Sequence, residues 1–149
     1  MLSKGLHGLF LDNTDMVETH AAQRDGMKAL VARLARKVHR RGKLLFTQNG
    51  DSSIGPTLRY YDGWNREDVT WTYDFDREQY VRVGSADHAD ALAAIRRIRG
   101  RGLLVTTTDY VAGGSTDAVL EAVEAACGAG AIPYVSNIQL SRVPSPLRC

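Results

Sequence analysis

The sequence lacks the long apolar run, the cysteine framework and the strong charge that mark several protein classes. No apolar stretch approaches the roughly 20 residues needed to span a bilayer, so we expect no membrane contact. The two cysteines, Cys127 and Cys149, permit one disulfide but do not predict it, and the redox compartment stays open. A net charge of +2 is too small to indicate nucleic acid or another polyanion as a partner.

Motifs for nucleotide, metal and nucleophile chemistry are missing as well. No GxGxxG or P-loop occurs, and VAGGSTD (residues 111–117) places a glycine pair before a helix without the lysine of a Walker motif. The four histidines show no metal-ligand spacing, and no Ser-His-Asp set can be assembled. The basic cluster within residues 33–41 is more typical of the solvated face of a helix than of a nucleic-acid site. The sequence therefore implies neither a metal nor an organic cofactor.

What the chain does contain is an alternation of short apolar runs and amphipathic helical patterns. Its 149 residues suit one domain, and 44% of them are hydrophobic. Residues 70–84 are polar and aromatic, and we expect a long loop or a short irregular element there. Strands alternating with helices predict β/α units around a parallel sheet. The predicted strands are residues 8–12, 43–51, 102–110 and 131–137 with a short one beginning near Tyr61, and the helical patterns cover residues 27–38, 91–98 and 119–127.

Each predicted strand turns from apolar to polar at its carboxyl end. The carboxyl ends of parallel strands meet at one rim, where the following loops form the ligand crevice. Any one acid there could equally bond turn amides or cap a helix. Several acids interleaved with flat aromatic rings, however, suit a carbohydrate, because acids perform the hydrolysis and rings stack on sugar faces. The acids and amides at these ends include Asp12, Asp15, Asn49, Glu67 and Asp109.

Five stretches in order resemble glycoside hydrolase family 114, which includes endo-α-1,4-polygalactosaminidases and the hydrolase domain of Pel-type exopolysaccharide proteins. The resemblance covers about residues 4–143, nearly the whole chain. Each motif alone is weak, but their order and spacing are hard to obtain by chance. The stretches are GLHGLFLDNTD (5–15), GMKALVARLARKVHRRGKLLFTQNG (26–50), YYDGWNREDVTWTYDFD (60–76), GLLVTTTDYV (102–111) and AIPYVSN (131–137).

The resemblance implies a function, which is hydrolysis of an α-1,4-linked, galactosamine-containing polysaccharide by a pair of carboxylates. The pair falls on Asp12 and Glu67, with Glu67 as acid/base or nucleophile and Asp12 as its partner. Whether the sugar configuration is retained depends on a carboxyl separation of about 5.5 Å rather than 6.5–9.5 Å, and stays open. Ammonium groups on such a polymer would attract an acid-rich groove. The expected substrate-binding residues are Asp15, Asn49, Trp64, Tyr73, Asp109, Tyr110 and Tyr134.

Family members are (β/α)8 barrels, which take about 250 residues, whereas five strands are visible here. We therefore expect a partial TIM barrel that holds about strands four to eight. It would form a single domain over residues 4–143 with a tail at 144–149, and the earlier β/α units and any export signal would be missing. Because the family is typically secreted, a chain without a signal peptide would be cytoplasmic as written, if Met1 is the true start, or a truncated secreted protein.

Five strands cannot close a tight barrel, so an apolar interior and two sheet edges would be exposed. A monomer is then expected to associate, and a homo-oligomer could complete the barrel. One alternative is a truncated, catalytically inactive fragment that binds sugar. Another, from a different class, is a flavodoxin-like module that binds a small anion at the GGSTD stretch.

Overall fold

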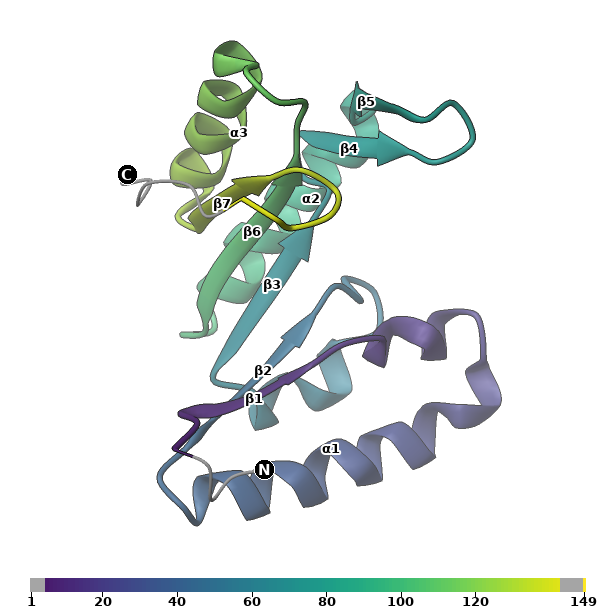
Figure 1. Cartoon of the computed structure of the whole chain (residues 1–149). Coiled ribbons are helices and arrows are strands. Elements are labelled where there is room, and N and C mark those ends of the chain that lie inside the picture. The colour runs from purple at the N-terminus through teal and green to yellow at the C-terminus, as the bar shows by residue number, and fades with distance from the viewer. Residues whose placement is uncertain (1–4, 143–148) are drawn as a thin grey trace. The chain divides into compact units, whose positions relative to one another are not determined.

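A computed structural model describes residues 5–142 and residue 149 (Figure 1). They belong to two compact units, Met1–Asn65 and Arg66–Cys149. Residues 4 and 143, the predicted limits of the domain, lie outside the described residues, as does the predicted tail apart from its last residue.

A five-stranded parallel sheet is the framework of the chain, which confirms the predicted α/β class. The strands follow chain order across the sheet, β1-β2-β3-β6-β7. A flavodoxin-like sheet reverses its strand order and binds its ligand where the order reverses. Because no reversal occurs here, the flavodoxin-like alternative is wrong. The strands are β1 (Gly8–Leu11), β2 (Leu44–Gln48), β3 (Gly63–Glu67), β6 (Leu104–Tyr110) and β7 (Ile132–Ser136).

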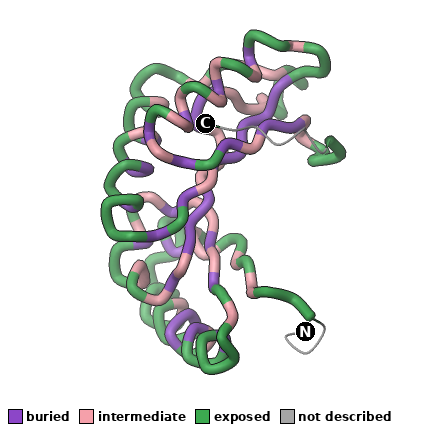
Figure 2. Tube along the Cα trace, turned by 90° about the vertical axis from the view of Figure 1, so that its left-hand side faces the viewer, coloured by how far each residue is buried: buried purple, intermediate pink, exposed green. Residues whose placement is uncertain are grey.

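In the first unit, helix α1 (Arg24–His39) covers β2. Its buried residues lie on one stripe, and β2 buries Leu45 and Thr47. Figure 2 colours the trace by burial and shows buried and exposed positions alternating along the chain. Basic residues gather in the last turn, where they offset the negative end of the helix dipole. The helix predicted over residues 27–38 is confirmed within α1. Three short 3-10 helices complete the unit: η1 (Thr14–Glu18), η2 (Ala21–Gln23) and η3 (Gly55–Tyr60).

In the second unit, α2 (Ser85–Arg99) and α3 (Thr116–Ala129) pack against each other and against β6. Ala118 and Ala122 of α3 form a buried cluster with Val111 and with Val135 of β7. Because alanine side chains are small, the helix can lie close to the sheet. Helix α3 ends at Gly130, whose φ of 83° gives the left-handed termination that favours glycine. A disulfide joins Cys127 of α3 to Cys149.

The loop predicted over residues 70–84 is wrong, because this segment forms an antiparallel hairpin of β4 (Trp71–Asp74) and β5 (Gln79–Arg82). Both strands contain aromatic and β-branched residues together with polar ones, a composition suited to a half-buried ribbon. Tyr73 lies opposite Tyr80, with ring centroids 5.0 Å apart, which is a stabilising cross-strand pair.

One face of the sheet is covered by helices and the other carries exposed apolar side chains. In the first unit, Phe10 and Leu44 on the uncovered face are 54% and 48% exposed. Phe46 lies on the same face over Gly63, its partner in β3, where a Cβ would come within 2.1 Å of the ring. In the second unit, Leu104 and Ile132 are 45% and 50% exposed. These residues stand where a closed barrel would have an interior. Among the described residues, no helix has the length and apolar character required to cross a bilayer.

Candidate active site

Polar side chains are linked to one another at the carboxyl ends of the first three strands. Asp12 follows β1 and is exposed, and its Oδ1 accepts hydrogen bonds from the N–H of Asn13 at 2.7 Å and from Gln48 Nε2 at 3.2 Å. Gln48 ends β2 and accepts in turn from Asn65 Nδ2 of β3 at 3.1 Å. The side chain of Asp12 is therefore held by its neighbours at the sheet rim, as the polar strand ends predicted.

Two asparagines turn the chain sharply at this rim. Asn13 and Asn49 have φ values of 55° and 54°, in the left-handed region where asparagine is common among non-glycine residues. Asn49 directly follows β2, whereas Asn13 follows Asp12, the first residue after β1. The backbone N–H of Asn49 still bonds to the carbonyl of Asn65 at 2.9 Å. These turns place Asp12 and Gln48 at the edge of the sheet instead of within it.

In the second unit, Glu67 ends β3 and contacts Tyr110, which ends β6. The hydroxyl of Tyr110 donates a hydrogen bond to Glu67 Oε1, and the half-buried carboxylate is thereby oriented. Tyr110 itself is only 6% exposed, so its hydroxyl is a fixed donor. The structure brings these two predicted residues together. Asp12 belongs to the first unit and Glu67 to the second, so their pairing remains a prediction.

Asp109 differs from its predicted place in the sugar cleft, because it is fully buried. Side chains alternate between the faces of a strand, and Asp109 is paired in register with Val135, which packs against α3. Asp109 therefore points to the helix side, while Tyr110 points to the other. Its Oδ1 accepts hydrogen bonds from the backbone N–H groups of Thr70 and Trp71 at 2.6 and 2.8 Å. Asp109 holds the turn between β3 and β4.

Burial also changes the charge state of this region. Removal from water raises the pKa of Asp109 to about 6, against the lowering effect of the amide bonds, and the nearby Asp68 carboxylate raises it further. The pKa of Asp68 is raised as well, chiefly by burial. Among the described residues, Asp68 Oδ1 and Asp109 Oδ2 are buried without a hydrogen-bond partner. Burial thus disfavours the ionised forms of two neighbouring acids of the second unit, Asp68 and Asp109.

Trp64 also departs from its predicted role as a sugar platform. It is paired in register with Thr47, on the helix side of the sheet, and has no exposed surface. Its indole Nε1 donates to the carbonyl of Asn49 at 2.7 Å, so it supports the turn after β2. Tyr73 instead stays half-exposed in the hairpin, with its ring 5.1 Å from that of Phe75. Phe75 is 73% exposed, and no motif in the sequence had singled it out.

The remaining predicted residues are Tyr134, Asp15 and Asn49. Tyr134 of β7 donates its hydroxyl to the carbonyl of Arg142 at 2.8 Å, which ties the segment after β7 back to the strand. Asp15 belongs to η1 and lies against Gly50, where a Cβ would come within 3.3 Å of the Asp15 Cβ. Asn49 lines a cavity of the first unit. Within residues 5–142 and 149, no group of three or more histidines, cysteines or acids could hold a metal ion.

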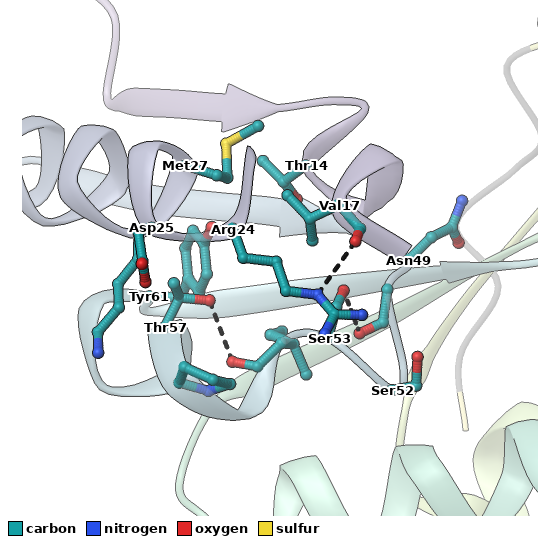
Figure 3. A pocket seen from close by; sticks show the side chains of 14 residues that line it. Thr14, Val17, Arg24, Asp25, Met27, Asn49, Ser52, Ser53, Thr57 and Tyr61 are labelled. Carbon is teal, nitrogen blue, oxygen red and sulfur yellow. Dashed lines mark hydrogen bonds between the residues drawn. The ribbon is translucent and has the colours of Figure 1, made fainter. Parts of the chain in front are cut away.

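The cavity that includes Asn49 has a volume of about 330 Å³ (Figure 3). It lies among η1, the first turn of α1 and the turn after β2. Arg24 crosses it, with Nε donating to the carbonyl of Val17 at 3.2 Å. Sequence reasoning missed this cavity because its residues come from three separate segments with no common motif. Its polar lining includes Thr14, Arg24, Lys28, Ser52, Ser53 and Thr57.

The parallel sheet and its covering helices define a class of structure, a partial (β/α)8 barrel. The particular match is to the glycoside hydrolase domain of PelA from Pseudomonas aeruginosa, with a TM-score of 0.82 and 23% sequence identity. A variant of that domain with one glutamate replaced by alanine matches with the same TM-score and 21% identity. Both matches cover 97% of this chain and 58% of the matched chain.

No family model and no curated protein matches the chain. The structural match therefore shows the fold. For the fold, it confirms the resemblance drawn from the motifs and the expectation of a partial barrel. The chain spans 58% of the length of the hydrolase domain it matches.

Proposed function

We propose that this chain contributes the catalytic carboxylates of a glycoside hydrolase that acts on a polysaccharide. The observation that carries the proposal is Glu67, oriented at the end of β3 by the hydroxyl of Tyr110, in a fold shared with a glycoside hydrolase domain. Enzymes with (β/α)8 barrels place their catalytic groups at the carboxyl ends of the strands. Glu67 occupies such an end.

The proposed reaction uses Glu67 as acid/base or nucleophile and Asp12 as the second carboxylate. Hydrolysis of a glycosidic bond needs two such groups, one to protonate the leaving oxygen and one to attack the sugar or activate water. Asp12 suits the second role because it is exposed and is held by Gln48 and by the N–H of Asn13. The buried Asp109, by contrast, has no access to the sugar.

The proposed substrate is an α-1,4-linked polymer that contains galactosamine. Its ammonium groups would be attracted to the acids at the rim, and its sugar rings would stack on exposed aromatic side chains. Tyr73 and Phe75 of the hairpin provide such a surface, flanked by Asp74 and Asp76. Phe75 takes the platform role in place of Trp64, which is buried.

The test is an assay for new reducing ends after incubation with partly deacetylated galactosamine polymer. We expect the wild-type protein to release them and Glu67→Gln to release at least about a hundredfold fewer, since positioned acid–base groups contribute on that order or more. Glu124→Gln, at an exposed position of α3, is the matched control and should behave as wild type. Equal release by wild type and Glu67→Gln would refute the catalytic role.

A second function, binding without cleavage, is favoured by the exposed ring of Phe75 beside Tyr73 in the hairpin. A partial barrel could bind the polymer without cleaving it. In that case the wild-type protein would sediment with the polymer and release no reducing ends, and Phe75→Ala would weaken the binding.

A further inference from the structure

The lining of the cavity in the first unit carries two cations, Arg24 and Lys28, and one acid, Asp25. Arg24 makes one hydrogen bond, from Nε to the Val17 carbonyl, and among the described residues neither Arg24 nor Lys28 forms an ion pair. Asp25, which also lines the cavity, forms none with them. The bond to Val17 anchors the guanidinium and leaves its Nη donors for another acceptor, as the view across the cavity shows (Figure 3).

Hydroxyl groups also line the cavity, and three of them already donate their protons within the protein. Thr57 Oγ1 donates to the carbonyl of Ile54 at 3.0 Å, Ser53 Oγ to that of Gly50 at 3.4 Å, and Ser52 Oγ to the carboxylate of Glu18 at 2.7 Å. A hydroxyl that donates keeps its acceptor lone pairs. The wall therefore offers acceptors, while Arg24 offers donors and charge.

The lining also includes apolar side chains that are firmly packed. Val17, Ile54 and Tyr61 contribute to it and are 6%, 4% and 7% exposed. A volume of about 330 Å³ is at the small end of the range for ligand pockets, about 300–1,000 Å³. A ligand that fits would be small, with one anionic group, several hydroxyl donors and an apolar face. A sugar ring that bears a carboxylate has all three.

We propose that this cavity binds a hydroxylated organic acid the size of one sugar acid, with its carboxylate on Arg24. Guanidinium and carboxylate pair through two parallel hydrogen bonds, which sets the orientation of the ligand. Its hydroxyls donate to Ser53 and Thr57, and its apolar face lies on Val17 and Ile54. The site is separate from the proposed hydrolysis, because its ligand is an anion and the proposed substrate a cation.

The experiment uses sodium D-galacturonate as the probe, with D-galactose and inorganic phosphate as comparison ligands, and measures affinity by calorimetry and by amide NMR shifts. We expect galacturonate to bind more tightly than either comparison ligand, with shifts at residues of the cavity. Galactose has the hydroxyls without the charge, and phosphate the charge without the apolar face. Binding of phosphate as tight as that of galacturonate would overturn the proposal, and so would the absence of any binding.

Three variants locate the site. Arg24→Gln should weaken galacturonate binding by about tenfold or more, since it removes a charge-assisted pair. Arg33→Gln, at an exposed position of α1 outside the cavity, is the matched control and should bind as wild type. Met27→Trp leaves the charges in place and should block binding because the larger side chain fills the cavity. This variant keeps the bond between Arg24 and Val17, so it tests the site without disturbing that bond. Unchanged affinity in both Arg24→Gln and Met27→Trp would refute the site.

Discussion

Replacing Asp109 with asparagine should alter how the stability of the protein depends on pH. Asparagine has nearly the shape of aspartate, and its Oδ1 can still accept the hydrogen bonds from the N–H groups of Thr70 and Trp71. The substitution therefore keeps the turn between β3 and β4 while removing a buried group that titrates. The position left for the new amide NH₂, that of Oδ2, has no hydrogen-bond partner among the described residues.

The magnitude follows from the pKa of Asp109, which burial raises to about 6. Aspartate in an unfolded chain has a pKa of about 3.9, so between about pH 4 and pH 6 the folded state binds more protons than the unfolded state. The free energy of unfolding must then fall as the pH rises through this range. A difference of about two pH units corresponds to about 3 kcal/mol at about 1.4 kcal/mol per unit. The unpaired amide costs the variant about 1–3 kcal/mol at every pH.

The assay is urea unfolding of wild type and Asp109→Asn at pH 4.5 and at pH 7. The free energy of unfolding of wild type, relative to the variant, should be lower at pH 7 than at pH 4.5 by about 2–3 kcal/mol. Asp90→Asn, at an exposed position of α2, serves as the control and should show no such change. If the difference between wild type and Asp109→Asn is the same at both pH values, Asp109 is not the buried titrating group described here.

Three other perturbations have expected outcomes. Tyr110→Phe removes the hydrogen bond to Glu67 and should lower both polymer cleavage and, by about 1–2 kcal/mol, the free energy of unfolding in urea. Reduction of the Cys127–Cys149 disulfide, whose cysteines are 22 positions apart, should lower the free energy of unfolding by about 3 kcal/mol, and an unchanged melting temperature in reductant would contradict this. Phe10→Lys on the uncovered sheet face should reduce self-association in sedimentation velocity. A wild-type protein that is already a monodisperse monomer would show that the apolar face does not cause association.

The strand positions could be predicted from the sequence because each strand is an apolar run that ends in polar residues. This pattern correctly located Asp12 after β1 and Glu67 at the end of β3. The hairpin of β4 and β5 was missed because it mixes aromatic with polar residues and includes three acids and two arginines, a composition also typical of loops. Pairing across the hairpin, seen in Tyr73 and Tyr80, is a tertiary contact that no single run of residues reveals.

The direction of individual side chains was harder to predict than the strands. Asp109 and Tyr110 are adjacent at the end of β6, and the pleat sends them to opposite faces, so only one of them can face the cleft. Trp64 was misplaced for the same reason, since its pairing with Thr47 sets it on the helix side. A shift of one residue in register exchanges the two faces. Register is set by contacts between strands, and the sequence alone did not determine it for β3.

The most direct test of the central claim compares Glu67→Gln with wild type in the release of reducing ends from partly deacetylated galactosamine polymer. The two side chains have almost the same size, so circular dichroism and the melting temperature should show that the fold is kept. The account predicts release by wild type and by Glu124→Gln, and a loss of at least about a hundredfold in Glu67→Gln. Release by Glu67→Gln at the wild-type rate would contradict the proposal that Glu67 is a catalytic carboxylate.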